Sequence, residues 1–139
     1  MYRHICSLAT AVSLFIFTVA VSACSSGSGP TDEQQAASAA KDYYDALIYG
    51  QPEQWVSGHC GASRMSGQYR QLLLENALMF LDQQRQAHGG ITEVSVGDLR
   101  GEYVDSCIIA LLTLSFADAS RETVAVPMVR ESDGVWKMK

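Results

Sequence analysis

Positive charge is scarce in this chain. Ten Lys and Arg residues stand against 15 Asp and Glu residues, which gives a formal net charge of −5, and no run of basic residues occurs. Phosphate backbones and anionic lipid headgroups repel an acidic surface. We therefore expect no nucleic-acid partner, and we interpret the acidity as a source of solubility.

The motifs of common catalytic and cofactor sites are also missing. The sequence contains no Gly-rich phosphate loop, no GxSxG, no HExxH and no CxxC. Each of these patterns places specific groups around a phosphate, a nucleophile or a metal ion. Their absence counts against the common hydrolases, and we expect neither a cofactor nor a metal site.

Two small sets of residues could still carry chemistry. Asp42 and Asp45 lie beside Tyr43 and Tyr44, and a carboxylate with a tyrosine can serve as acid, base or oxyanion donor. Carboxylates at this spacing on an outward helix face are more often a solvated edge, which is the interpretation we favour.

The second set contains His59, Cys60 and His88. Together they suggest a thiol dyad or metal ligands, but adjacent residues seldom bind one metal ion well. A histidine at a helix end and a structural cysteine are the more typical roles for such residues.

The first 23 residues have the pattern of an export signal. Arg3 precedes an uncharged run over residues 5–21, which is shorter than the roughly 20 apolar residues of a membrane-spanning helix. The sequence Val21-Ser22-Ala23-Cys24 that follows resembles the lipobox of bacterial lipoproteins. The alternatives are an ordinary signal peptide with an incidental cysteine, or an uncleaved anchor.

The resemblance implies cleavage after Ala23 and attachment of lipid to Cys24. Residues 24–31 then form a lipidated, flexible tether, and residues 32–139 form one domain. The mature chain has nine cations against 15 acidic residues, a net charge of −6. We expect a lipid-anchored protein of the cell envelope. Because Ser25 is not Asp, a cell with two membranes would hold it on the outer membrane, facing the periplasm.

Apolar spacing predicts three helices in the first half of the domain. Thr31 or Asp32 caps the first, and Gly50 follows its end; Pro52 begins a short second helix that ends at Gly58. The longest helix covers residues 66–87. Its expected inward residues are Tyr69, Leu72, Leu73, Ala77, Phe80 and Leu81, and its expected outward residues are Arg70, Glu75, Gln83 and Arg85.

After Gly89-Gly90 the apolar period changes to two, which predicts strands. We expect four, over residues 91–103, 107–116, 122–130 and 135–138, joined by short turns into an antiparallel meander. Gly97 and Gly101 are typical of bulges or a bend, and we expect one of these in the first strand. The predicted fold class is α+β, with three N-terminal helices packed on one face of a four-stranded antiparallel sheet.

The strand over residues 107–116 is apolar on both faces near its middle, because Ile109 and Leu111 oppose Ala110 and Leu112. Its second face is therefore expected to be covered. Neighbouring long side chains could shield it, or a homodimer could form through the outer face of the sheet.

Cys60 and Cys107 are the cysteines that remain after Cys6 leaves with the signal and Cys24 takes the lipid. An oxidising envelope favours a disulfide between them, worth about 3 to 4 kcal/mol in the chain-entropy model. The alternative is two thiols that behave as small apolar residues.

Several segments together resemble a family of bacterial lipoproteins of unknown function in the cystatin-like, nuclear-transport-factor-2-like superfamily. They are the lipobox, a short tether, a helix ending at Gly50, a long helix ending His88-Gly89-Gly90-Ile91, and the terminal hairpin from Pro127 to Met138. The most specific match is Asp133-Gly134-Val135-Trp136-Lys137, similar to the family's "DGKWK" ending, with Val135 in place of the usual Lys. The resemblance implies a cone in which a curved sheet wraps the long helix and often leaves a pocket, and dimers through the outer sheet face.

Aromatic residues are the candidates for lining such a pocket, although aromatics at this spacing are usually core. They are Tyr43, Tyr44, Trp55, Tyr69, Tyr103 and Trp136. We favour a non-enzymatic domain that binds a small ligand or a protein. The alternatives are a small pocket enzyme of the same fold, of the isomerase or hydrolase type, and a structural dimer.

Overall fold

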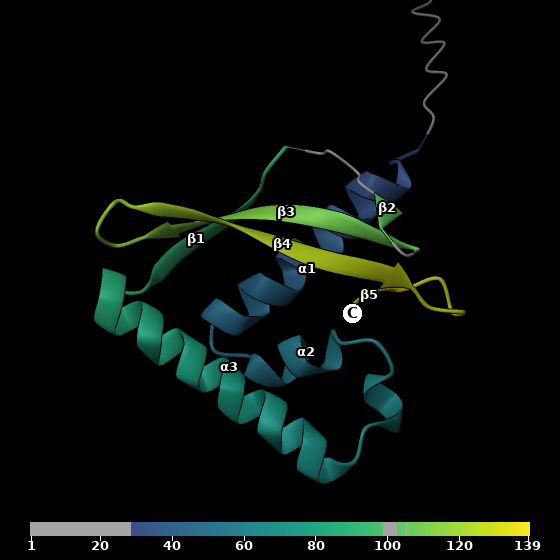
Figure 1. The fold of residues 1–139 in the computed structure, drawn as a ribbon, viewed down its shortest axis with the longest axis horizontal. Helices are drawn as coiled ribbons and strands as arrows, with labels where there is room; N and C mark the ends of the chain where they lie inside the picture. Colours follow the sequence, from purple (N-terminus) through teal and green to yellow (C-terminus); the bar gives the residue numbers. More distant parts are fainter. Residues whose placement is uncertain (1–28, 99–102, 105) are drawn as a thin grey trace, which may run out of the picture.

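The computed structural model describes residues 29–98, 103–104 and 106–139, and it confirms an α+β fold. The helices come first: α1 (Asp32–Ile48), α2 (Pro52–Ser57), a 3-10 turn (Ala62–Arg64) and α3 (Gly67–His88). The strands follow: β1 (Ile91–Val96), β2 (Tyr103–Val104), β3 (Cys107–Phe116), β4 (Arg121–Arg130) and β5 (Trp136–Met138). The helices lie on one side of a curved antiparallel sheet (Figure 1).

Helix α1 is the centre of the helical layer. Thr31 caps it with a capping box, in which the Thr31 hydroxyl accepts from the Gln34 amide and the Gln34 side chain accepts from the Thr31 amide. Its buried residues, four alanines and a leucine, are small enough to bring the helix close to the strands. It packs against β1, β3, β4 and β5 on one side and against α2 on the other.

The sheet has the order β1-β3-β4-β5, all antiparallel, so the predicted meander is confirmed. β2 pairs with the start of β3, where Val104 lies opposite Cys107. In β3 alternate residues from Ile108 to Phe116 are buried, whereas Ile109 and Leu111 on the outer face are half-buried. Neighbouring strands thus shield part of that outer face. A dimer through it stays a prediction.

The strand predicted over residues 91–103 is two strands. β1 ends at Val96, and the Gly97 amide then donates to the Leu111 carbonyl at 2.8 Å. A Cβ at position 97 would lie 3.2 Å from that oxygen, so glycine fits this close approach. The register shift of β1 lies between Ile91 and Glu93 and not at Gly97. Gly101 lies outside the described residues.

Strand β5 joins the sheet to α1 and α2. The Met138 amide donates to the Gly58 carbonyl at 2.8 Å, and the Tyr43 hydroxyl donates to the Trp136 carbonyl at 3.0 Å. Gly58 lies directly against the Tyr43 ring, because a Cβ at position 58 would lie 2.6 Å from it. This contact fixes the angle between α1 and α2.

Helix α3 lies at the edge of the molecule, beyond α1 and α2 (Figure 1). Ser66 caps it and Gly89 ends it in the left-handed conformation, within one residue of the prediction. Its predicted faces are partly wrong: Tyr69 and Leu72 are exposed, whereas Arg70 is half-buried. The Arg70 guanidinium turns inward because it donates to the Ala62 carbonyl at 2.9 Å and to the Ser57 hydroxyl at 3.3 Å.

Candidate functional site

A pocket of about 250 Å³ lies where the three helices meet. Its lining residues come from α1 (Tyr44, Leu47), α2 (Trp55) and α3 (Asn76, Ala77, Phe80). Tyr44 and Leu47 are three residues apart and so share one face of α1. Ala77 is the one buried residue of α3, and its small side chain leaves the space that Leu47 and Phe80 border.

The walls are apolar, with polar groups on Tyr44, Trp55 and Asn76. Burial raises the pKa of the Tyr44 phenol above its usual range, so the hydroxyl stays protonated and can donate. The Trp55 indole nitrogen is buried without a hydrogen-bond partner, which costs about 1 to 3 kcal/mol in general. Asn76 is exposed and marks the solvent side of the pocket. The lining contains no charged side chain.

Two of the six aromatic residues predicted for a pocket, Tyr44 and Trp55, meet here. Tyr43 instead belongs to the core beside β5, and Trp136 is buried in the same cluster. Tyr69 lies two turns before the pocket on α3 and borders a separate hollow, and the Tyr103 side chain lies outside the described residues. The sequence pattern missed Leu47, Asn76, Ala77 and Phe80 as lining residues. Helical spacing shows which side chains point inward, but it does not show where they leave a space between helices.

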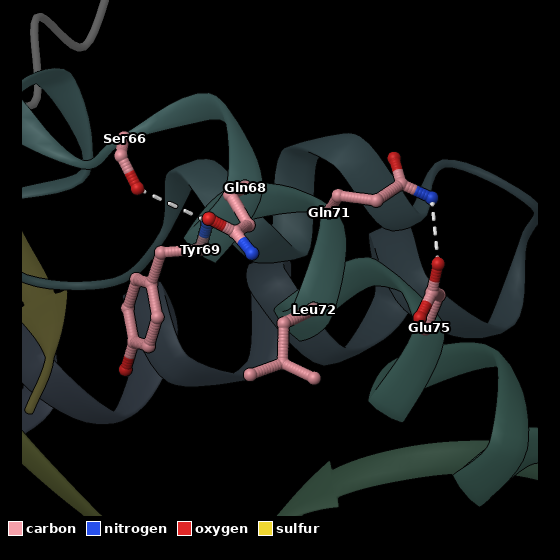
Figure 2. A pocket seen from close by; sticks show the side chains of 6 residues that line it. All are labelled: Ser66, Gln68, Tyr69, Gln71, Leu72 and Glu75. Carbon is pink, nitrogen blue, oxygen red and sulfur yellow. Dashed lines mark hydrogen bonds between the residues drawn. The ribbon is translucent and has the colours of Figure 1, made fainter.

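Tyr69 borders a second hollow, of about 480 Å³, along the first half of α3. Figure 2 shows its residues on the exposed side of the helix. They are Ser66, Gln68, Tyr69, Gln71, Leu72 and Glu75. The Gln71 amide donates to the Glu75 carboxylate at 3.1 Å. This hollow is a helix surface and not an enclosed cavity.

A disulfide between Cys60 and Cys107 is not formed in the structure. Cys60 is a free, exposed cysteine, and Cys107 is buried at the start of β3. The Cys60 amide donates to Met138 of β5 at 2.7 Å, and β4 separates β5 from β3. Strands lie about 4.8 Å apart, whereas a disulfide joins Cα atoms about 4.4 to 6.8 Å apart. The intervening strands keep the two thiols from reaching each other.

His59 follows α2 and His88 ends α3, and the two rings make their contacts in different parts of the molecule. His59 Nδ1 is 3.1 Å from the Trp55 carbonyl, and its ring meets the Trp55 ring edge-on at 4.4 Å. Burial lowers the pKa of His59. Among the described residues no cluster of His, Cys, Asp and Glu could hold a metal ion.

Asp42 and Asp45 border an open hollow of about 300 Å³ on the outer side of α1. Asp42 is exposed, and Asp45 forms an ion pair with Lys41 one turn earlier. This arrangement is the solvated edge that the spacing favours.

His88, Asp118 and Ser120 form a cluster that the sequence did not reveal, because 30 residues separate its two halves. His88 Nδ1 is 2.9 Å from the Asp118 carboxylate and 3.3 Å from the Ser120 hydroxyl. In a catalytic triad the acid and the serine contact different ring nitrogens. Here both contact Nδ1, so the cluster joins the end of α3 to the β3–β4 turn and activates no nucleophile.

The pKa of Asp118 is lowered to about 2 by hydrogen bonds from Ser120 and His88. The Asp118 amide also donates to the His88 carbonyl at 3.1 Å. These bonds give the cluster a structural role.

Comparison with known proteins identifies the fold of this chain. No protein-family model and no curated protein matches the chain. Among solved structures, the chain is similar to the "Putative NTF2-like transpeptidase" from Campylobacter jejuni, with a TM-score of 0.55 and 11% identity. The match covers 71% of this chain and 92% of the other. Together with the helices on a curved antiparallel sheet, it shows that the chain contains an α+β domain of the NTF2-like fold.

Proposed function

We propose that this chain is a lipid-anchored binding protein of the cell envelope, and that its NTF2-like domain holds a small neutral ligand between α1, α2 and α3. The pocket lined by Tyr44, Trp55 and Phe80 carries the proposal. A fold of this kind supports ligand-binding and enzymatic sites alike, so the choice between them depends on the groups in the pocket.

The ligand is expected to be an uncharged ring with a hydrogen-bond acceptor. An apolar cavity of roughly 150 Å³ holds benzene, and this pocket measures about 250 Å³, which suits a substituted single ring. A ligand with a full charge would lose its hydration without meeting a counter-charge. An acceptor on the ring would suit the Tyr44 hydroxyl and the Asn76 amide, which are polar groups of the lining.

Catalysis by the same pocket has less support. No carboxylate or imidazole lines it, so a general base within reach of a ligand is lacking. The Campylobacter protein is named as a transpeptidase. In this chain, Ser38-Ala39-Ala40-Lys41 has the S-x-x-K spacing of serine transpeptidases.

That spacing does not assemble a nucleophile here. Lys41, one turn after Ser38, is ion-paired with Asp45, and the hydrogen bond that it donates to Asp45 raises the Lys41 pKa. A raised pKa keeps the lysine protonated, so it accepts no proton from a serine. The S-D-N and K-T-G motifs of such enzymes are also missing from the sequence.

Anchoring rests on the lipobox-like Val21-Ser22-Ala23-Cys24. Among the residues that the structure describes, no helix has the length and apolar character needed to cross a membrane. Acyl chains on Cys24 would supply the attachment. Replacement of Cys24 with serine should abolish acylation of the protein in cells and release it from the membrane fraction, and retention in the membrane would contradict the anchor.

Ligand binding is tested with three probes of one shape: benzyl alcohol, benzoate and benzylammonium. Saturation-transfer NMR should show binding of the neutral probe and weak or no binding of the two ions. Ala77→Leu should abolish the signal because it fills the pocket, whereas Ala87→Leu, on an exposed position of the same helix, should keep it. Equal binding of the ions, or binding that survives Ala77→Leu, would contradict the pocket.

A further inference from the structure

Helix α3 forms one wall of the pocket, yet it is weakly attached to the rest of the molecule (Figure 1). The opposite wall belongs to α1 and α2, where Leu47 is 1% exposed. α3 packs mainly on α2 and β1, and Ala77 is the one buried residue of its 22. A helix with few buried apolar contacts opens locally at a lower free energy than the core does. The wall that α3 supplies is therefore the wall most able to move.

The C-terminal end of α3 is held to the turn between β3 and β4. The Asp118 amide donates to the His88 carbonyl at 3.1 Å, and the Ala117 amide donates to the Gly90 carbonyl at 3.0 Å. The His88 ring also contacts the Asp118 carboxylate, and its centre lies 4.6 Å from that of the Phe116 ring. These contacts fix this end on the sheet, so a motion of α3 would have its pivot here.

Arg70 connects the N-terminal half of α3 to its surroundings. Its guanidinium donates to the Ala62 carbonyl at 2.9 Å and to the Ser57 hydroxyl at 3.3 Å. Ala62 belongs to the turn before α3, whereas Ser57 lies on α2. The bond to Ser57 therefore joins α3 to a helix of the opposite wall.

The packing between α2 and α3 is incomplete around Arg70. A hollow of about 230 Å³ lies here, and Val56, Leu74 and Arg70 border it. The pocket itself lies farther along α3, so space separates α3 from the inner helices at two places. Atoms on the two sides of such a gap lose dispersion contacts. The hydrogen bonds of Arg70 consequently supply a larger share of the attachment of α3.

We propose that Arg70 is a latch that holds α3 against α2, and that α3 swings about its C-terminal end to admit and hold the ligand. Ala77 and Phe80 line the pocket from α3, and Leu47 and Trp55 line it from the inner helices. A swing of α3 separates these two sets. Arg70 is not part of the lining, so it acts as a positioning residue. This inference rests on the proposed function, because the pocket is what α3 uncovers.

A ligand in the pocket contacts α3 and the inner helices together, so it holds the moving wall in place. Binding and closure are then linked, and whatever favours the closed wall raises the affinity for the ligand. Arg70→Met should weaken binding because it lowers the population of the closed state. The side chain itself touches no ligand.

Thiol labelling tests the motion without a ligand. The experiment uses the chain from Ser25 onward, which keeps every described residue, with Cys60→Ser and Ala77→Cys. Position 77 is buried while the wall is closed, and its thiol should react with an aromatic disulfide reagent faster than Cys107, which is buried at the start of β3. Mass spectrometry of the labelled peptides gives both rates, and equal rates would overturn the proposal.

Variants of Arg70 test the latch. Arg70→Met should speed labelling at position 77 about tenfold, the loss expected for one or two hydrogen bonds, and should leave Cys107 unchanged. Arg70→Lys should recover part of the effect because an ammonium group can still donate. Arg85→Met is the matched control, since Arg85 is exposed on the same helix and pairs with Asp82 of that helix. Equal effects of Arg70→Met and Arg85→Met would overturn the latch.

Hydrogen exchange of the unchanged protein separates this proposal from that of the pocket. Saturating benzyl alcohol should slow exchange in α3 and leave exchange in β3 unchanged, and its affinity should fall in Arg70→Met but not in Arg85→Met. Binding without a change in α3 would overturn the coupling. Failure of benzyl alcohol to bind would contradict the proposed function, whereas the labelling rates would still decide whether α3 opens.

Discussion

Helices α1 and α3 are both amphipathic, yet the molecule covers them to very different extents. α1 buries five of its 17 residues, and α3 buries one of its 22. The reason is position: α1 lies between the sheet and α2, whereas α3 packs mainly on α2 and the start of β1. An apolar period shows which side of a helix can be buried, but the rest of the chain decides how much of that side is covered.

Leucine-to-alanine changes should show this contrast most strongly. Leu47 on α1 is 1% exposed, and Leu47→Ala should cost about 2 to 5 kcal/mol of unfolding free energy because it leaves a cavity. Leu72 on α3 is half exposed, and Leu72→Ala should cost about 0.5 kcal/mol or less. Urea unfolding of dilute samples measures both, and equal losses would remove the distinction between the two helices.

Gly58→Ala should be the next largest effect, because it acts where α1 meets α2. The new Cβ would lie 2.6 Å from the Tyr43 ring, which forces the two helices apart at a cost of about 1 to 3 kcal/mol. Gly67→Ala is the control, since open space surrounds a Cβ at position 67. Thermal unfolding should show a lower Tm for Gly58→Ala alone.

The N-caps offer a finer comparison. Thr31→Ala and Ser66→Ala each remove a side-chain acceptor from the start of a helix, and each should cost the helix about 1 kcal/mol. The loss at α1 should lower the stability of the whole domain, because the core unfolds with α1. The loss at α3 should appear mainly as faster local hydrogen exchange, and a global effect as large as that of Thr31→Ala would contradict the partial independence of α3.

Protonation of Asp118 at acid pH should destabilise the C-terminal end of α3, and this should be the smallest of the four predicted effects. The Asp118 pKa is about 2 in the folded protein and 3.8 in the reference state, so its contribution to stability is complete above pH 4 and disappears as the pH falls toward 2. The Tm of Asp118→Asn should lie below that of the unchanged protein at pH 6. That difference should shrink between pH 4 and pH 2, and a difference independent of pH would show that the carboxylate charge is not involved.

Local signals made the fold accessible from the sequence. Thr31 and Pro52 begin helices where their local chemistry places them, apolar spacing locates α3 to within one residue, and the alternation from Cys107 to Phe116 gives β3 its limits. These features depend on residues near each other in the chain. Their physical causes can therefore be evaluated without the tertiary structure.

The candidate site was less accessible because it depends on contacts between distant segments. Trp55 and Tyr44 were identified as aromatics, but Ala77 and Asn76 become lining residues only once α3 lies beside α1 and α2. The position of β4 and β5 between Cys60 and Cys107 is equally invisible in the spacing of the two cysteines. Arg70 turned inward because a carbonyl of the turn before α3 was within its reach.

Hydrogen exchange followed by mass spectrometry tests the contrast between α1 and α3 most directly. In dilute protein, peptides from α1 should exchange as slowly as those from β3, whereas peptides from α3 should exchange faster through local opening. Equal protection of both helices would contradict the view that α3 is the partly covered helix of this domain.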